Sequence, residues 1–243
     1  MDGSVRVAEV PAGRGAAWLA ESFRLFRASP LPWMGLCAGW MSITLALLLI
    51  PLLGGVVASF LQPAFFASFA ITAYKQTAGE RLAMSDLFSG FRRQLRSLVA
   101  VGALELLAAI AVFAIMAAMG LPMVPESADH VFTVGEYVEL LEGKEWILAI
   151  GFLLMVAVKG ALWFAPPLIA FHGMPAMHAV RWSVYAALEN LGAMMVYGAI
   201  LLALVFVAAL PSGLGLIVAL PMAAISTYVG YRDVFEARAL TPA

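Results

Sequence analysis

The chain has 243 residues, of which 63% are hydrophobic and 12% are charged, and its mean hydropathy is +0.96. Soluble domains carry about 25% charged residues, so this composition excludes an ordinary water-soluble protein and predicts that lipid surrounds much of the chain. The formal net charge is −1, and the single cysteine, Cys37, excludes an intrachain disulfide.

Six apolar segments are predicted to cross a membrane as helices, since one crossing needs about 20 apolar residues. No charged residue occurs from Leu31 to Tyr74, and "PLLGG" (51–55) divides this run because Pro and Gly end helices. The predicted spans are residues 32–51, 55–74, 98–121, 146–170, 191–210 and 213–231. They make one integral membrane domain, 1–243, with the fold class of an all-α polytopic transmembrane helical bundle.

The distribution of Lys and Arg predicts the orientation of this bundle. Twelve of the 14 basic residues fall on one side of a six-span layout, and basic loops stay in the cytoplasm. Both termini are therefore expected to be cytoplasmic. Tyr74, Tyr231, Trp33 and Trp146 lie near predicted span ends, where aromatic rings favour the interface.

Three amphipathic segments on the cytoplasmic side predict short helices in the headgroup region: 16–27, 85–96 and 177–190. Ser85 is a candidate N-cap of the second. These helices either pin the fold at the interface or recognise a lipid or partner. The arginines expected to contact lipid headgroups are Arg24, Arg27, Arg92, Arg93, Arg96 and Arg181.

Each interfacial segment precedes two spans, which suggests a triplicated unit of interfacial helix plus hairpin. The second span of each pair carries proline, at Pro63, Pro166 and Pro167, and Pro221. Prolines are tolerated in spans when neighbouring helices or water satisfy the freed carbonyls. Kinked helices that face one another are therefore expected.

Three stretches carry a resemblance to a known family: "AGRGAAWLAESFRLFRASPLPW", "LLLIPLLGGVVASFLQPAFFASF" and "FAPPLIAFHGMPAMHAVRWS". They resemble an uncharacterised bacterial six-span inner-membrane family, and more distantly the YciC-like membrane proteins. The resemblance covers most of the chain except 122–145. It implies a location in the bacterial inner membrane, and it carries no catalytic or binding residues to this sequence.

Residues 122–145 form the one long polar stretch on the outer side, and most of its charges are acidic. Thr133 precedes Glu136 by three residues, the spacing of a capping box. A short amphipathic helix is predicted there. It serves either as a solvated lid that favours the topology or as a docking surface for a partner.

Two charges of opposite sign lie inside predicted spans, Glu105 in the third and Lys159 in the fourth. Such charges are costly, by about 2.5–3.5 kcal/mol each at a helix centre. Their depths match, which predicts an ion pair inside the bundle. The pair either fixes the register of two helices or forms a polar station on a path or headgroup pocket. Lys159 alone, extending to the interface, is the third alternative.

No pattern of a known hydrolase, nucleotide-binding loop or metal site occurs in the sequence. No catalytic residue, cofactor or metal is therefore predicted, and interfacial arginines do not indicate nucleic acid. The leading hypothesis is a non-enzymatic scaffold or accessory subunit that organises lipids or a membrane complex, with a membrane-protein partner or a second copy. The rival hypothesis is a small carrier or channel for a lipid or small solute that uses Glu105 and Lys159.

Overall fold

The computed structural model describes residues 6–51, 53–121, 135, 139 and 141–236. Its regular structure in these ranges is helical, which confirms the all-α prediction. The longer helices are α1 (Arg14–Ala28), α2 (Pro30–Leu48), α3 (Leu53–Thr77), α4 (Leu95–Ala118), α6 (Glu145–Leu162), α7 (Ala165–His172), α8 (Ala176–Glu189), α9 (Leu191–Ala209) and α10 (Leu216–Tyr231). Two 3-10 turns, η1 (Met84–Phe88) and η2 (Gly90–Arg92), precede α4, and a π-helix, η3 (Arg232–Glu236), continues α10.

Five of the predicted spans correspond to helices that are long and apolar enough to cross a membrane. These are α2, α3, α4, the consecutive pair α6–α7 and α9. The sixth predicted span, 213–231, is occupied by α10, which has only 16 residues. By length and composition, the described chain therefore supplies five candidate spans rather than six.

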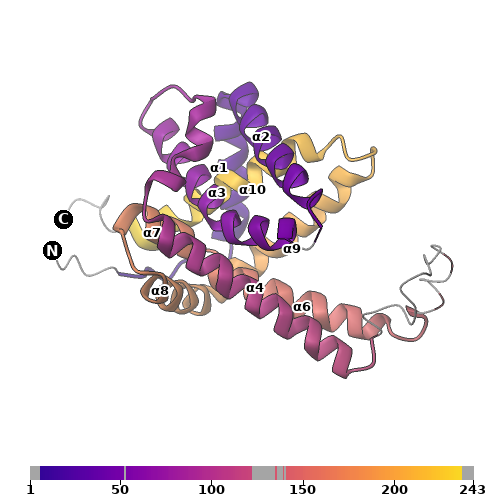
Figure 1. Ribbon diagram of the computed structural model, residues 1–243. Coiled ribbons are helices and arrows are strands. Elements are labelled where there is room, and N and C mark those ends of the chain that lie inside the picture. The colour runs from indigo at the N-terminus through magenta and orange to yellow at the C-terminus, as the bar shows by residue number, and fades with distance from the viewer. Residues whose placement is uncertain (1–5, 52, 122–134, 136–138, 140, 237–243) are drawn as a thin grey trace.

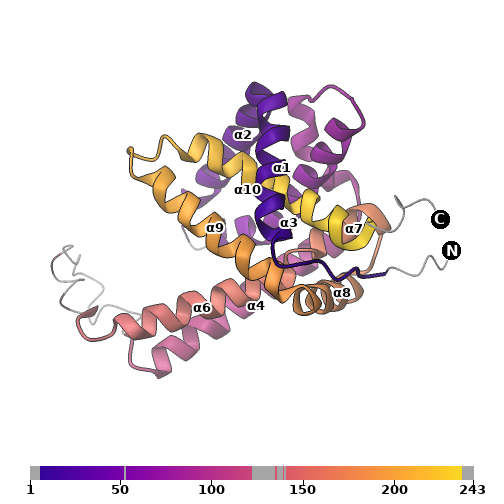
Figure 2. The ribbon, with the colours of Figure 1, turned by 180° about the vertical axis from the view of Figure 1, so that it is seen from behind.

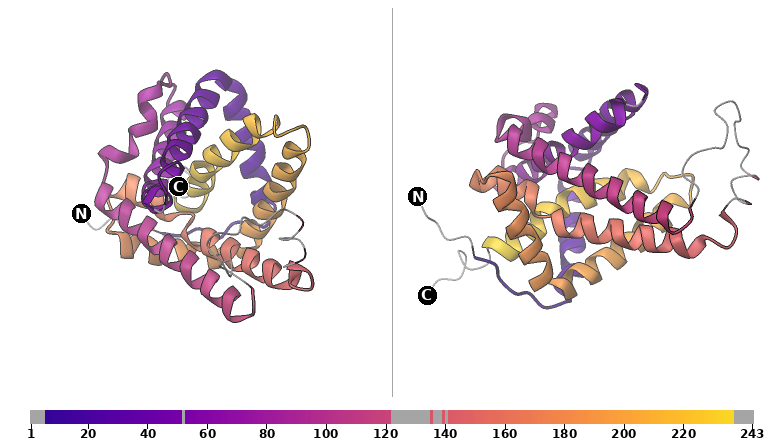
Figure 3. Two further views of the ribbon diagram at one scale, coloured as in Figure 1. Left: turned by 45° about the vertical axis from the view of Figure 1, so that its right-hand side comes forward. Right: turned by 60° about the horizontal axis from the view of Figure 1, so that its bottom comes forward.

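The helices form a body from which one hairpin diverges. In Figures 1 and 2 the α4–α6 hairpin points away from α9 and α10, and the right-hand view of Figure 3 shows α4 and α6 side by side. The distal half of the hairpin has a small core of its own, with Val112 and Met116 of α4 against Ile147 of α6. The larger core lies in the body.

Helix α1 crosses α10 steeply within this body, as Figure 2 shows. It packs against α10 and α9 and buries Trp18, Leu19, Ser22 and Phe26. The close approach to α9 requires a glycine, because a Cβ at Gly15 would lie 2.1 Å from the carbonyl oxygen of Ala193. The interfacial segment predicted at 16–27 is thus a helix, and one of its faces belongs to the core.

The double proline breaks the fourth predicted span in two. Helix α6 ends at Leu162, and Pro166 and Pro167 occupy the first turn of α7, where proline is tolerated. Ser183 of α8 secures this break, since its Oγ donates to the Ala161 carbonyl at 2.7 Å and accepts from the Phe164 N–H at 3.1 Å. Pro63 and Pro221, by contrast, lie inside the uninterrupted helices α3 and α10.

Two of the aromatic residues expected at the interface lie in the core instead. Trp33 is fully buried, and its Nε1 donates to Gln76 Oε1 at 2.8 Å. Tyr231 is also buried, and its ring stacks on Phe171. Burial of Trp33 and Tyr231 is favourable because each ring and its polar atom find partners in the core. The positions of the two residues in the sequence do not reveal these partners.

The predicted helix at 85–96 is wrong in detail. The segment forms η1 and η2, and Arg96 already belongs to α4. Gly90 packs so closely on α3 that a Cβ would lie 2.3 Å from the Ala64 carbonyl oxygen, which favours a turn here over a continuous helix. The start of the segment is held by Asp86 rather than Ser85, because Asp86 Oδ2 accepts the Ala83 N–H at 2.7 Å. The helix predicted in 122–145 lies almost entirely outside the described residues.

Candidate functional site

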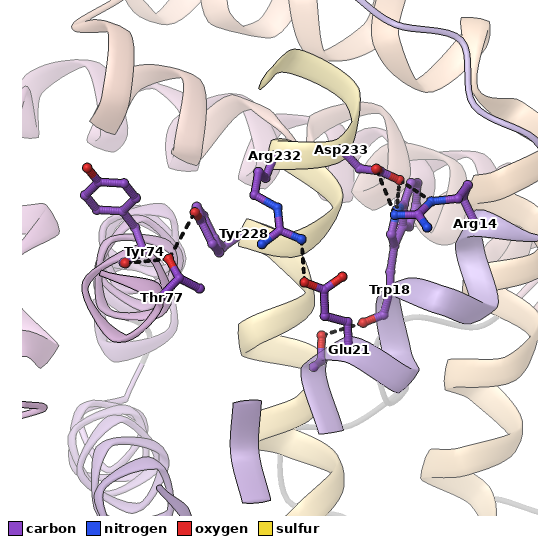
Figure 4. Close-up of polar contacts among 9 residues, drawn as sticks. Arg14, Trp18, Glu21, Tyr74, Thr77, Tyr228, Arg232 and Asp233 are labelled. Carbon is purple, nitrogen blue, oxygen red and sulfur yellow. Dashed lines mark hydrogen bonds and ion pairs between the residues drawn. The ribbon is translucent and has the colours of Figure 1, made fainter. Parts of the chain in front are cut away.

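The densest group of charged contacts joins α1 to the end of α10 (Figure 4). Asp233 accepts two bonds from the Arg14 guanidinium, Nε to Oδ2 at 2.7 Å and Nη2 to Oδ1 at 2.8 Å. The indole Nε1 of Trp18 donates to the same Oδ2 at 2.8 Å. The neighbouring Arg232 is paired with Glu21. We call these five residues the α1–α10 clamp.

Helical spacing on α1 presents three of the clamp residues together. Arg14, Trp18 and Glu21 follow one another at four and three residues, so they share a face of the helix. Arg232 and Asp233 are consecutive residues that open the π-helix η3, and π-helical turns often occur at functional sites. Hydrogen bonding to the Asp233 carboxylate raises the pKa of the Arg14 guanidinium above its ordinary value, so this cation stays charged.

A second row of polar contacts continues from the clamp to α3, as Figure 4 shows. The guanidinium carbon of Arg232 lies 5.8 Å from the ring centroid of Tyr228, a cation–π distance. The Tyr228 hydroxyl is 3.4 Å from Thr77 Oγ1, which donates to the Tyr74 carbonyl at 2.7 Å. Together, the clamp and this second row link α1, α10 and the end of α3.

Asn190, at the junction of α8 and α9, fastens the segment that leads into α1. It is 1% exposed, its Oδ1 accepts from the Val10 N–H at 2.8 Å, and its Nδ2 donates to the Ala8 carbonyl at 3.1 Å. The Ala8 N–H in turn donates to the Val234 carbonyl at 2.8 Å. The start of α9 and the end of α10 thus meet the same short stretch of chain.

The structure brings the two predicted intramembrane charges together. Lys159 Nζ lies 2.9 Å from Glu105 Oε2 and 3.4 Å from Gln62 Oε1 of α3. A glycine makes this meeting of helices close, because a Cβ at Gly102, one turn before Glu105, would lie 2.6 Å from the Ser59 carbonyl oxygen, one turn before Gln62. Sequence reasoning missed Gln62, although an amide in the middle of an apolar span was a usable signal.

Exposure of this polar triad is uneven. The side chain of Glu105 is 14% exposed and that of Lys159 is 46% exposed. Two of the three ammonium hydrogens have acceptors in Glu105 and Gln62. Nearly half of the Lys159 side chain therefore lies at the surface of the described chain.

The six arginines predicted to contact headgroups are all exposed: Arg24, Arg27, Arg92, Arg93, Arg96 and Arg181. Within the described ranges, none of them forms an ion pair. Arg14, Lys75, Lys159 and Arg232, by contrast, form ion pairs, and each joins an acid on a different element. The clamp residues were not predicted from the sequence, where Arg14 and Asp233 are 219 positions apart.

The chemistry available to these groups is that of static pairing. No group of three His, Cys, Asp or Glu side chains in the described ranges is placed to hold a metal ion. Every buried side-chain nitrogen or oxygen there has a hydrogen-bond partner. The ion-paired groups therefore connect helices, and Lys159, within the candidate span Glu145–His172, has the most exposed side chain of the four pairs described, at 46%.

The chain is similar in sequence to a known bacterial protein. The chain is 28% identical over 212 residues to a protein of Burkholderia thailandensis named "Probable inner membrane protein", and the match covers 82% of this chain and 76% of the relative. No family model and no solved structure matches the chain.

The clamp yields a first test, the replacement Asp233→Asn. The amide keeps the size of the carboxylate and cannot accept charge-assisted bonds from both Arg14 and Trp18, so we expect a loss of about 1–3 kcal/mol in the free energy of unfolding. Thermal unfolding of the purified protein in mild detergent measures it. The control is Glu189→Gln, which removes an exposed carboxylate from α8 and should change stability by less than about 0.5 kcal/mol. Equal stability of the two variants would show that the Asp233 carboxylate contributes nothing measurable to the free energy of unfolding.

Proposed function

We propose that this chain is an integral protein of a bacterial inner membrane. Five helices are long and apolar enough to span a bilayer, and the Burkholderia thailandensis relative bears an inner-membrane name. Large apolar side chains that are more than half exposed support lipid as their solvent, among them Leu153 of α6, Leu107 of α4 and Phe206 of α9. The likeness to YciC-like membrane proteins stays a prediction.

Six crossings with both termini in the cytoplasm are proposed for this bundle. Asn190 at the start of α9 and Val234 after α10 both bind the stretch Ala8–Val10. If α9 crosses the bilayer outward, α10 must return through the same thickness to reach that stretch. The charged residues Arg232 and Asp233, which follow α10 directly in η3, suit a helix end at the cytoplasmic face. The order of elements, a short helical segment followed by two apolar ones, also agrees with a triplicated unit.

The role that the geometry favours is a non-enzymatic scaffold or accessory subunit. The observation that carries this proposal is the α4–α6 hairpin, which diverges from the body and exposes apolar side chains, Phe113 of α4 and Phe152 of α6 among them, each about half exposed. Arg14, Glu21, Arg232 and Asp233 of the body are engaged in holding helices together. The diverging hairpin then offers a membrane-embedded surface for a partner protein or for a second copy of the chain.

Cross-linking in native membranes tests the scaffold proposal. A photoreactive phenylalanine analogue in place of Phe152, which is 49% exposed, should give a discrete protein adduct. The same analogue in place of Phe206, which is 67% exposed on α9, is the matched control and should give lipid adducts alone. An adduct of twice the monomer mass would identify a second copy. Lipid adducts alone at both positions would contradict the scaffold proposal.

The exposure of Lys159 favours a second candidate, a carrier or channel for a lipid or small solute. Charged groups within the bilayer normally face a bundle interior or a water-filled cavity. A lysine side chain that is 46% exposed, with its ammonium beside Glu105 and Gln62, is the kind of group that such a path would place at its centre.

Cysteine labelling with a membrane-impermeant reagent tests the carrier. Val156, one turn before Lys159 and 48% exposed, is replaced by cysteine in a Cys37→Ala background, so that the ion pair stays intact. A water-filled path predicts that this cysteine is labelled, whereas a cysteine at the 62% exposed Leu107 of α4 is protected by lipid. Protection of both positions would contradict the carrier and leave the scaffold proposal standing.

The same reagent tests the topology. Arg6→Cys and Glu80→Cys, both at exposed positions, should be labelled only from the cytoplasmic face, and Leu214→Cys, in the turn between α9 and α10, only from the outer face. Because Ala8 binds Val234, this pattern requires α10 to cross. Labelling of Arg6→Cys and Leu214→Cys from the same face would overturn the six-crossing arrangement.

A further inference from the structure

Three exposed arginines, Arg92, Arg93 and Arg96, are concentrated where the chain enters α4. The only acidic residue in the sequence between 83 and 98 is Asp86. Its carboxylate is occupied by Lys75, whose Nζ lies 3.0 Å and 3.2 Å from the two oxygens. The cluster therefore presents three positive charges with no local acid to neutralise them.

The backbone beneath this cluster is held firmly against α3. The Gly90 N–H donates to Ser68 Oγ at 2.9 Å, and the close approach to Ala64 leaves no room for a Cβ at Gly90. The Phe91 ring packs edge-on against Phe65 with a centroid distance of 4.9 Å. The arginines consequently project from a fixed platform, which lowers the entropy lost when they bind a ligand.

The position of the cluster matches the headgroup level of a bilayer. Arg96 lies in the first turn of α4, a candidate span that begins at Leu95. Phe88 and Leu95 on the same segment are 43% and 39% exposed. These apolar side chains can enter the acyl layer while the guanidinium groups remain beside the phosphates.

The other arginines predicted to contact headgroups do not share this arrangement. Arg24 and Arg27 lie on α1, where the Arg27 guanidinium carbon is 5.8 Å from the Phe23 ring centroid, and Arg181 stands on α8. Guanidinium groups bind phosphate oxygens bidentately. We infer that Arg92, Arg93 and Arg96 form a binding site for the phosphodiester headgroup of an anionic phospholipid.

This inference rests on the proposed placement of the chain in a bilayer, and it needs no partner protein. The test uses the full chain in non-ionic detergent and phosphatidylglycerol as the probe, with binding followed by native mass spectrometry. Phosphatidylcholine is the neutral lipid for comparison, and inorganic phosphate is the soluble anion. The wild-type chain should retain phosphatidylglycerol in preference to both.

Two matched variants locate the site. The triple variant Arg92→Gln, Arg93→Gln and Arg96→Gln should lose on the order of 100-fold in affinity for phosphatidylglycerol, since each basic residue near an anionic surface contributes about 1 kcal/mol, or about fivefold. The triple variant Arg24→Gln, Arg27→Gln and Arg181→Gln removes the same charge and should lose less than about threefold if the site is local. Unchanged thermal unfolding in lipid-free detergent verifies the fold of both.

Three outcomes would overturn the inference: equal losses in the two variants, equal retention of the two lipids by the wild-type chain, or equal binding of inorganic phosphate. If the first variant is unstable, Arg→Lys at the same three positions keeps the charge and loses the bidentate geometry. The affinity of this Lys variant for phosphatidylglycerol should be lower than that of the wild-type chain. Failure of this test leaves the scaffold proposal intact. Conversely, lipid adducts alone in the cross-linking experiment leave the headgroup site intact.

Discussion

The junction of α1 with the end of α10 centres on a single carboxylate, that of Asp233. It holds the Arg14 guanidinium through two bonds and the Trp18 indole through a third, and so fixes where α1 crosses the end of α10. Trp18 then brings its ring against Trp163 and Tyr197, which joins the break between α6 and α7 to α9. With α1 in place, the Leu25 carbonyl accepts from Gln76 of α3 at 2.9 Å. Polar contacts of one short helix therefore connect most of the body.

Electrostatic contacts have this importance because lipid removes the usual driving force for helix association. In a bilayer, apolar side chains gain little from leaving lipid for a protein interior, so helices associate through close packing and polar contacts. Both are visible here. Glycines allow backbone contact at Gly15 with α9 and at Gly102 with α3, and Gly151 makes room for the Met116 side chain of α4. The ion pair Lys75–Asp86 joins α3 to η1, and the ion pair Lys159–Glu105 joins α6 to α4.

The same physics explains what could be predicted from the sequence. Composition and run length indicated the helices, because a crossing must be apolar and about 20 residues long. The Glu105–Lys159 contact followed from matched depth and opposite sign, since few charges lie in the spans. The clamp could not be found in this way, because Arg14 and Asp233 lie in polar segments where many pairings were open. Trp33 and Tyr231 were misplaced for a related reason: an aromatic residue near a span end suits the interface and the core equally well.

The charges of the molecule divide into two groups with different tasks. Three acids on the arginine-rich side are paired inside the fold, Glu21 and Asp233 in the clamp and Asp86 with Lys75. Each of these pairs is neutral as a unit, so it stabilises the bundle without changing the net charge of that side. Arg92, Arg93 and Arg96 on the same side are exposed and form no ion pair within the described ranges. Six of the 15 acidic residues lie in the segment 122–145, so a net charge of −1 conceals an excess of basic residues on the proposed cytoplasmic side.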